Sequence, residues 1–152
     1  MNKKSAGILL FRFKNEVIEV LLAHPGGPFW KNKDKGAWSV PKGEFEFELP
    51  LEAAKREFKE EIGTDVDGDF VELMPIKQKN GKMIFIWALQ GNLDTSKVKS
   101  NLFELEFPPN SGIIKSYPEI DKASWFKLSK AKEKINHGQA GFLFQLEKIF
   151  QL

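Results

Sequence analysis

The stretch from Glu48 to Gly63 constrains the fold most, because it reads as one helix with a defined start and stop. Pro50 suits the first helical position, since its φ is already helical and its missing N–H would have no partner there. Gly63 stands where a helix stop is expected. An apolar stripe at helical spacing comprises Leu51, Ala54, Phe58 and Ile62. The pattern therefore predicts a helix that buries one face in a core.

Three glutamates, Glu57, Glu60 and Glu61, fall together on the adjoining stripe of this helix. Like charges at this spacing repel by about 0.2–0.5 kcal/mol per pair, and the helix dipole disfavours anions near the C-terminus. A hard divalent cation removes the conflict, because Mg²⁺ and Mn²⁺ prefer carboxylate oxygens. The alternative interpretation is a solvated acidic face, balanced by neighbouring basic residues: Lys55, Arg56 and Lys59.

The residues around the helix resemble the signature of the Nudix hydrolases. That family carries a Gly, a spacer, a Glu, a second spacer, Arg-Glu, an apolar residue, any residue, Glu-Glu, any residue and a Gly. From Glu48 onward the match is in register, through Arg56-Glu57, Phe58, Glu60-Glu61 and Gly63. The preceding segment, Trp38 to Gly43, is similar to the short strand that leads into the family's loop. The resemblance favours the metal site over the solvated acidic face.

Two departures from the family pattern affect the loop before the helix. Only the residues from Glu44 to Phe47 separate Gly43 from Glu48, one residue fewer than the family has. Phe47 also stands where a small residue is usual, and Thr64 replaces an aliphatic residue after the final glycine. The short loop bears on the geometry of the Gly43 carbonyl as a metal ligand, and hence on the turnover rate. It leaves the helical carboxylates in register.

The resemblance implies a Mg²⁺ or Mn²⁺ ion held by residues of this signature. The ligands it implies are Glu57, Glu60, Glu61 and the Gly43 carbonyl. Glu119 precedes Trp125 at the spacing of a family carboxylate that adds a ligand or serves as general base. The alternatives are Asp121 in that role, or a loop carboxylate at Glu119 that pairs with Lys115 or Lys122.

The resemblance also assigns supporting roles near the metal. Arg56 would pair with Glu48 and orient the ligands without reacting, and Lys42 would contact a phosphate. Phe29 and Trp30 stand in a loop with three lysines, the combination that stacks a base and neutralises phosphates. The alternative is a loop packed by its own aromatics. His24, just before this loop, is expected to be structural.

Composition and charge limit the remaining function classes. A chain of 152 residues with 41% hydrophobic content predicts one domain, 1–152. The net charge of +2 argues against binding to duplex nucleic acid or to an anionic membrane. The chain contains no cysteine, which excludes disulfides and thiolate catalysis and is compatible with a cytoplasmic location. We expect a nucleotide as the small-molecule partner, and a monomer or homodimer.

Strand and helix patterns alternate along the chain. Strands are predicted at 5–13 and 17–24, a hairpin at 70–78 and 82–90 across Asn80-Gly81, and a further strand at 102–107. Ser129 is predicted to cap a helix that ends at about Asn136, and a last helix is predicted over 139–152. Alternating elements indicate an α/β fold. The resemblance implies the Nudix α/β/α sandwich with a mixed central sheet.

The implied activity is metal-dependent hydrolysis of a phosphoanhydride bond in a nucleoside diphosphate linked to another moiety. Similarity to the asymmetric diadenosine tetraphosphate hydrolases makes dinucleoside polyphosphates the first hypothesis for the substrate. The alternatives are a (d)NTP pyrophosphohydrolase and a non-catalytic nucleotide-binding Nudix module. A 5′-end RNA pyrophosphohydrolase would require a longer basic track than lysines 77, 79 and 82 provide.

Overall fold

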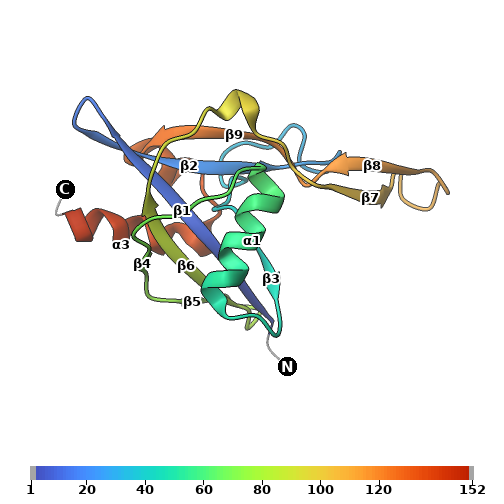
Figure 1. Ribbon diagram of the computed structural model, residues 1–152. Coiled ribbons are helices and arrows are strands. Elements are labelled where there is room, and N and C mark those ends of the chain that lie inside the picture. Colours follow the sequence, from blue (N-terminus) through green and yellow to red (C-terminus); the bar gives the residue numbers. More distant parts are fainter. Residues whose placement is uncertain (1–2, 151–152) are drawn as a thin grey trace.

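A mixed, seven-stranded sheet forms the middle layer of the computed structural model, which describes residues 3–150 (Figure 1). The path β4-β6-β1-β2-β9 orders the sheet, while β3 pairs with β1 and β5 pairs with β6. β1 and β6 run parallel, and the other pairs are antiparallel. The strands are β1 (Lys4–Lys14), β2 (Val17–Pro25), β3 (Lys42–Phe45), β4 (Val71–Glu72), β5 (Ile76–Lys77), β6 (Met83–Gln90) and β9 (Ile120–Lys127).

The long strand β1 serves two partners along one edge. Its beginning pairs with β3, so that Ala6 lies opposite Gly43, and its end pairs with β2, so that Phe11 lies opposite Val20. Its other edge pairs with β6. β1 therefore places the loop that precedes the signature helix directly beside the centre of the sheet.

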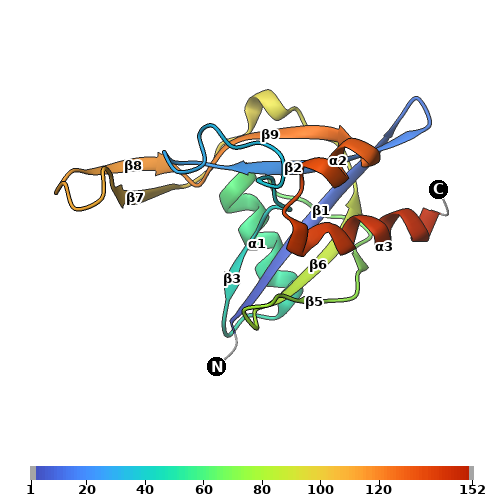
Figure 2. The same cartoon turned by 180° about the vertical axis from the view of Figure 1, so that it is seen from behind.

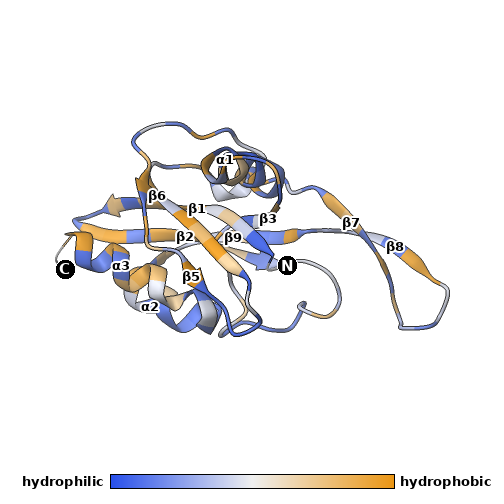
Figure 3. Ribbon diagram, turned by 90° about the horizontal axis from the view of Figure 1, so that it is seen from below, coloured by the Kyte–Doolittle hydropathy of each residue, from blue (hydrophilic) through white to orange (hydrophobic). Residues whose placement is uncertain are grey.

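Helices cover both faces of the sheet (Figures 2 and 3). Helix α1 (Pro50–Ile62) lies on one face, and α2 (Leu128–Lys134) and α3 (Ala140–Phe150) lie on the other. Alternate residues of β1 feed the two cores, with Ile8 under α1 and Leu9 under α2 and α3. This arrangement confirms the predicted α/β/α sandwich with a mixed sheet. None of the helices in residues 3–150 is long and apolar enough to cross a membrane.

Helix α1 begins and ends as its sequence predicts. Pro50 occupies its first turn, and Gly63 follows its last residue with a φ of 87°, in the left-handed region that favours glycine. The Gly63 N–H donates to the Lys59 carbonyl at 2.8 Å. Phe58 and Ile62 are completely buried. The stripe of three glutamates, Glu57, Glu60 and Glu61, therefore lies at the edge of the buried face of α1.

A hairpin projects from the body of the molecule (Figure 1). Its strands, β7 (Leu102–Glu106) and β8 (Ile114–Pro118), form a separate two-stranded sheet. The sequence predicted the first strand but not β8. The Phe107 ring meets Phe29 edge-on at 5.4 Å between centroids, which joins the hairpin to the loop after β2.

Local differences from the predicted elements have physical reasons. The strand expected before the loop lies within it, as β3, while Trp38 and Ser39 form only isolated bridges. The predicted strand 70–78 is split into β4 and β5 around Pro75, which has no N–H to donate.

The C-terminal helices also differ at their ends. Lys127, not Ser129, is the residue before α2, and its side chain makes no capping hydrogen bond. Ser129 lies inside the first turn of the helix. A short 3₁₀ helix (His137–Gln139) precedes α3. The last two residues of the predicted helix 139–152 lie outside the described residues. A second 3₁₀ helix (Thr95–Lys97) follows β6.

Candidate active site

The carboxylates of α1 face strand β3. Glu57 is only 8% exposed, and a Cβ added to Gly43 would overlap its carboxylate. Glu61 accepts a hydrogen bond from the backbone N–H of Lys42 at 3.1 Å. The absence of a side chain at Gly43 is therefore what lets the helix carboxylates approach the loop backbone.

Arg56 links three of the predicted site residues. Its Nε and Nη2 donate to the Glu48 carboxylate at 2.7–2.9 Å, in a bidentate arrangement. Its Nη1 donates to Glu57 at 2.8 Å and to Glu60 at 3.1 Å. Arg56 therefore ties the loop before α1 to two helical carboxylates, and its contact with Glu48 is the pairing predicted from the sequence.

Burial disfavours ionisation of three carboxyl groups at this site, those of Glu57, Glu61 and Glu119. Burial, and then the charge of Glu57, raises the pKa of Glu61 to about 8. Burial also raises the pKa of Glu57, against the opposing effect of Arg56. The pKa of Glu119 is raised by burial and by the charge of Glu60. A cation among these carboxylates would favour their ionised forms.

The backbone holds Glu119 in place beside α1. The Glu119 N–H donates to the Asn101 carbonyl at 2.8 Å, and the Asn101 N–H donates to the Glu60 carbonyl at 2.9 Å. The Glu119 carbonyl in turn accepts from Gly26 at 2.9 Å. Sequence reasoning missed Asn101, because it acts through backbone groups that carry no residue-type signal. Its contacts join Glu119 to the last turn of α1.

Asp121, the alternative to Glu119, has a different partner. Its carboxylate lies 2.9 Å from His24 Nδ1, and His24 Nε2 lies 2.6 Å from the Lys33 carbonyl. His24 is 1% exposed and meets the Trp38 ring edge-on. These contacts fasten the loop after β2 to β9. They give His24 and Asp121 a structural role and favour Glu119 as the carboxylate of the site.

The predicted substrate-binding residues lie in two places. Lys42 is beside the carboxylates, where burial and then the charge of Lys82 lower the pKa of its ammonium group. Phe29 and Trp30 are 51% and 38% exposed on the loop after β2. Their closest ring partners are Phe107 and the Lys33 ammonium, respectively. Lys42 therefore belongs to the carboxylate group, Phe29 contacts the projecting hairpin, and Trp30 contacts Lys33 of its own loop.

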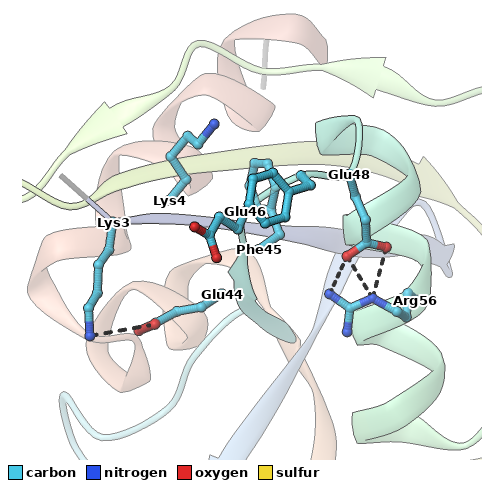
Figure 4. A pocket seen from close by; sticks show the side chains of 8 residues that line it. Lys3, Lys4, Glu44, Phe45, Glu46, Glu48 and Arg56 are labelled. Atoms are coloured by element: carbon cyan, nitrogen blue, oxygen red, sulfur yellow. Dashed lines mark hydrogen bonds and ion pairs between the residues drawn. The ribbon is translucent and has the colours of Figure 1, made fainter. Parts of the chain in front are cut away.

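A cavity of about 820 Å³ opens on the Glu48 side of Arg56 (Figure 4). Its lining includes Lys3, Lys4 and the Phe47 ring, which is 92% exposed. Figure 4 shows the paired Glu48 and Arg56 side chains along one side of it. Arg56 thus separates this cavity from the carboxylates of the helix.

The carboxylate group suits a hard divalent cation in its chemistry. All the candidate side-chain donors are carboxylate oxygens, the ligands that Mg²⁺ and Mn²⁺ prefer, and neighbouring negative charge or burial raises the pKa values of Glu57, Glu61 and Glu119. Among residues 3–150, however, no three Asp, Glu or His side chains converge at the spacing of a metal centre. The carboxylate oxygens are suitable ligands for such a cation, and Arg56 donates hydrogen bonds to two of these carboxylates, Glu57 and Glu60.

Comparison with known proteins identifies the family. The family model of the NUDIX domain matches residues 1–146. No curated protein sequence matches the chain at a significant level.

Solved structures share the fold at low sequence identity. The NUDIX domain of Shewanella oneidensis NrtR, complexed with ADP ribose, has a TM-score of 0.70 and 12% identity, over 99% of this chain and 89% of that one. A Caenorhabditis elegans Ap4A hydrolase binary complex has a TM-score of 0.63 and 21% identity, over 98% and 97%. A mutT/nudix family protein from Listeria innocua has a TM-score of 0.61 and 16% identity, over 98% and 94%. The solved structures share the fold, and the family match shows that the chain belongs to the Nudix family and is a hydrolase acting on acid anhydrides.

Proposed function

We propose that the protein hydrolyses a phosphoanhydride bond of a dinucleoside polyphosphate, such as diadenosine tetraphosphate, in a reaction that depends on Mg²⁺ or Mn²⁺. The observation that carries the metal dependence is the packing of two α1 carboxyl groups, Glu57 and Glu61, against Gly43 and the Lys42 N–H of β3, where burial raises the pKa of both. A chain selected for stability alone would avoid this cost. The choice of substrate rests on the sequence resemblance alone.

The carboxylates on α1 supply the proposed metal ligands. Glu57, Glu60 and Glu61 would hold the ion with Glu119 and the Gly43 carbonyl. Such an ion polarises the phosphoryl oxygens and lowers the pKa of bound water. Arg56 holds Glu57 and Glu60 from one side, with Glu48 fixing the guanidinium in turn.

The proposed substrate contacts follow the positions of the cationic and aromatic groups. Lys42 lies next to the Glu61 carboxylate and would bind a phosphate oxygen near the cleaved bond. Phe29 and Trp30, on the exposed loop, would stack a nucleobase. A (d)NTP pyrophosphohydrolase would use the same groups, and the substrate panel below separates the two.

The test is release of phosphate-containing products from a panel of compounds. The panel holds diadenosine polyphosphates, nucleoside triphosphates, ADP-ribose and nucleotide sugars, each with Mg²⁺, Mn²⁺ or chelator. We expect cleavage of diadenosine tetraphosphate with metal only. Glu61→Gln should lower kcat by about a thousandfold, because a bound cation contributes several kcal/mol to the transition state. The matched control is Glu52→Gln, an exposed glutamate of the same helix.

The panel also contains the outcomes that contradict the proposal. Cleavage in the presence of chelator, or full activity of Glu61→Gln in saturating Mg²⁺, would contradict the proposed metal site. Preferential cleavage of nucleoside triphosphates would show that the protein is a (d)NTP pyrophosphohydrolase and not a dinucleoside polyphosphate hydrolase. Tight nucleotide binding without measurable hydrolysis would make the protein a binding module, with the short loop between Gly43 and Glu48 as the first place to look.

A further inference from the structure

A second cavity, of about 700 Å³, opens between β5 and the start of α3. It is lined by Ile76 and Lys77 of β5, by the turn that follows, and by His137 and Gly141 on the helical side. Ile76 packs against the core beneath α2 and α3, whereas α1 packs against the other core. Figure 3 shows α1 and the pair α2–α3 on opposite sides of the sheet. The cavity is therefore separate from the carboxylate site.

The charge of this cavity has one sign. Lys77, Lys79 and His137 line it, and no acidic side chain does so within the described residues. Neither lysine forms an ion pair with any part of the chain that the structure describes. In a chain with 23 basic and 21 acidic residues, this is a local separation of charge. The cavity therefore favours an anion.

The acidic residues on flanking elements are engaged elsewhere. Gly36 lies beside the His137 ring, so the loop that contains Asp34 approaches the cavity. The Asp34 carboxylate bonds to Lys134, and Glu133 of α2 lies 3.2 Å from Lys130. Both negative charges are compensated by lysines outside the cavity. The net charge facing the cavity stays positive.

Hydrogen-bond donors complete the lining. The Gln78 amide nitrogen would lie 3.0 Å from a Cβ at Gly138, so the glycine leaves this side chain room at the wall. Gly141 lies in the first turn of α3, where the helix dipole favours anions, and the N–H of the preceding Ala140 already donates to the His137 carbonyl. A Cβ at Gly141 would come 2.8 Å from Ile76 Cδ1. Gly141 thus leaves room for the Ile76 side chain to pack against the start of the helix.

We propose that this cavity is an accessory binding site for the phosphate chain of a small molecule. Its volume falls in the range of about 300–1,000 Å³ of ordinary ligand sites and exceeds what one phosphate fills. Two lysines and a histidine match several phosphate groups. No Phe, Tyr or Trp ring lines the described cavity, so the phosphates and not a base carry the recognition. Inorganic tripolyphosphate and a nucleoside triphosphate share this chemistry.

The test is an NMR titration of the ¹⁵N-labelled full chain with tripolyphosphate, in chelator so that nothing is hydrolysed. We expect saturable shifts of the Gly138 and Gly141 amide signals, matched by ATP and absent with adenosine. Lys77→Ala/Lys79→Ala should weaken binding at least about tenfold, since each charged contact contributes more than a neutral one. Lys97→Ala, an exposed lysine on the 3₁₀ helix after β6, is the control.

Three results would overturn the proposal. Shifts confined to Gly43 and α1 would place the phosphates at the carboxylate site. Equal affinities of the double variant and Lys97→Ala would show that the lysines do not hold the ligand. Affinity for a single-stranded oligonucleotide far above that for tripolyphosphate would assign the surface to nucleic acid. Each variant's own spectrum confirms that it is folded, and none of these readouts depends on hydrolysis.

Discussion

The two faces of the sheet bury polar groups in different ways. Under α2 and α3, the Gln139 side chain is 3% exposed, and its Oε1 accepts from the Val40 N–H at 2.9 Å and from the Ser39 hydroxyl at 3.2 Å. Under α1, burial raises the pKa of Glu57 and Glu61. The buried Gln139 amide therefore has neutral partners, whereas the buried groups under α1 are carboxyl groups whose ionisation is disfavoured.

This difference separates stability from chemistry within one sheet. Phe58 and Ile62 anchor α1 as firmly as Phe142 anchors α3, since all three are completely buried. The carboxylates of α1 lie on the neighbouring stripe, outside the apolar core that these rings and aliphatic groups form. Substitutions on the two faces should therefore change different quantities.

The largest effect is expected from Phe142→Ala on the α3 face. Removing this buried ring from the core should lower the free energy of unfolding by about 3–5 kcal/mol. Chemical denaturation measures the loss, and turnover should persist wherever the variant is folded. Phe144→Ala is the control on the same helix, because Phe144 is 55% exposed. Equal losses for the two variants would contradict the assigned core.

The next effect is a dependence of stability on pH from the α1 face, in the presence of chelator. The pKa of Glu61 is about 8 in the folded chain against an ordinary value of 4.5. Between these values the folded state keeps a proton that the unfolded state has released. The free energy of unfolding should therefore fall as pH rises through this window, by at most about 1.4 kcal/mol per pH unit from this group.

Denaturation of Glu61→Gln across the same pH range checks that prediction. The variant should lose the part of the slope that Glu61 contributes, because glutamine does not titrate. Glu52→Gln, with its exposed carboxylate, should keep it. An unchanged slope in Glu61→Gln would show that this carboxylate is ionised in the folded chain.

A smaller effect is expected from Arg56→Lys. Lysine keeps the positive charge but cannot make the bidentate contact with Glu48 while also reaching Glu57. Turnover should fall about 10–100-fold, as for other groups that orient metal ligands. Kinetics with saturating Mg²⁺ provide the measurement, and Arg12→Lys, which alters an ion pair with Glu19, is the control. Wild-type turnover of Arg56→Lys would mean that a positive charge at this position is enough to orient the carboxylates.

The smallest effect is expected from Gly43→Ala. The added methyl group would overlap the Glu57 carboxylate, which can rotate away because it ends a flexible side chain. We expect about a tenfold loss in kcat/KM and little change in the midpoint of thermal unfolding. Gly91→Ala, which crowds only Leu10, should keep its activity. Equal activity of both variants would contradict the proposed role of Glu57 as a metal ligand.

The sequence predicted the parts of the molecule whose signals are local. Helix α1 follows from Pro50, Gly63 and its apolar stripe, and β1 and β2 follow from their runs of Ile, Leu and Val. Arg56 pairs with Glu48 as the signature implies. In each case, residue type and spacing within one element suffice.

Features that depend on long-range backbone contacts were not predictable. Strand β8 contains Ser116 and Pro118 and has no clear strand pattern, yet β7 pairs with it residue by residue. Asn101 joins Glu119 to α1 through backbone groups alone. The basic cavity combines the turn after β5 with His137, which lie far apart in the chain.

The projecting hairpin offers a place to attach other molecules. Its tip lies away from the sheet (Figure 1), and a side chain placed at Gly112 would meet nothing within 4 Å. Exposed loop tips of this kind tolerate insertion, because few contacts depend on them. A fluorophore or a surface linker joined at Ser111 should therefore allow the protein to be tracked or immobilised while the sheet and its carboxylates stay as they are.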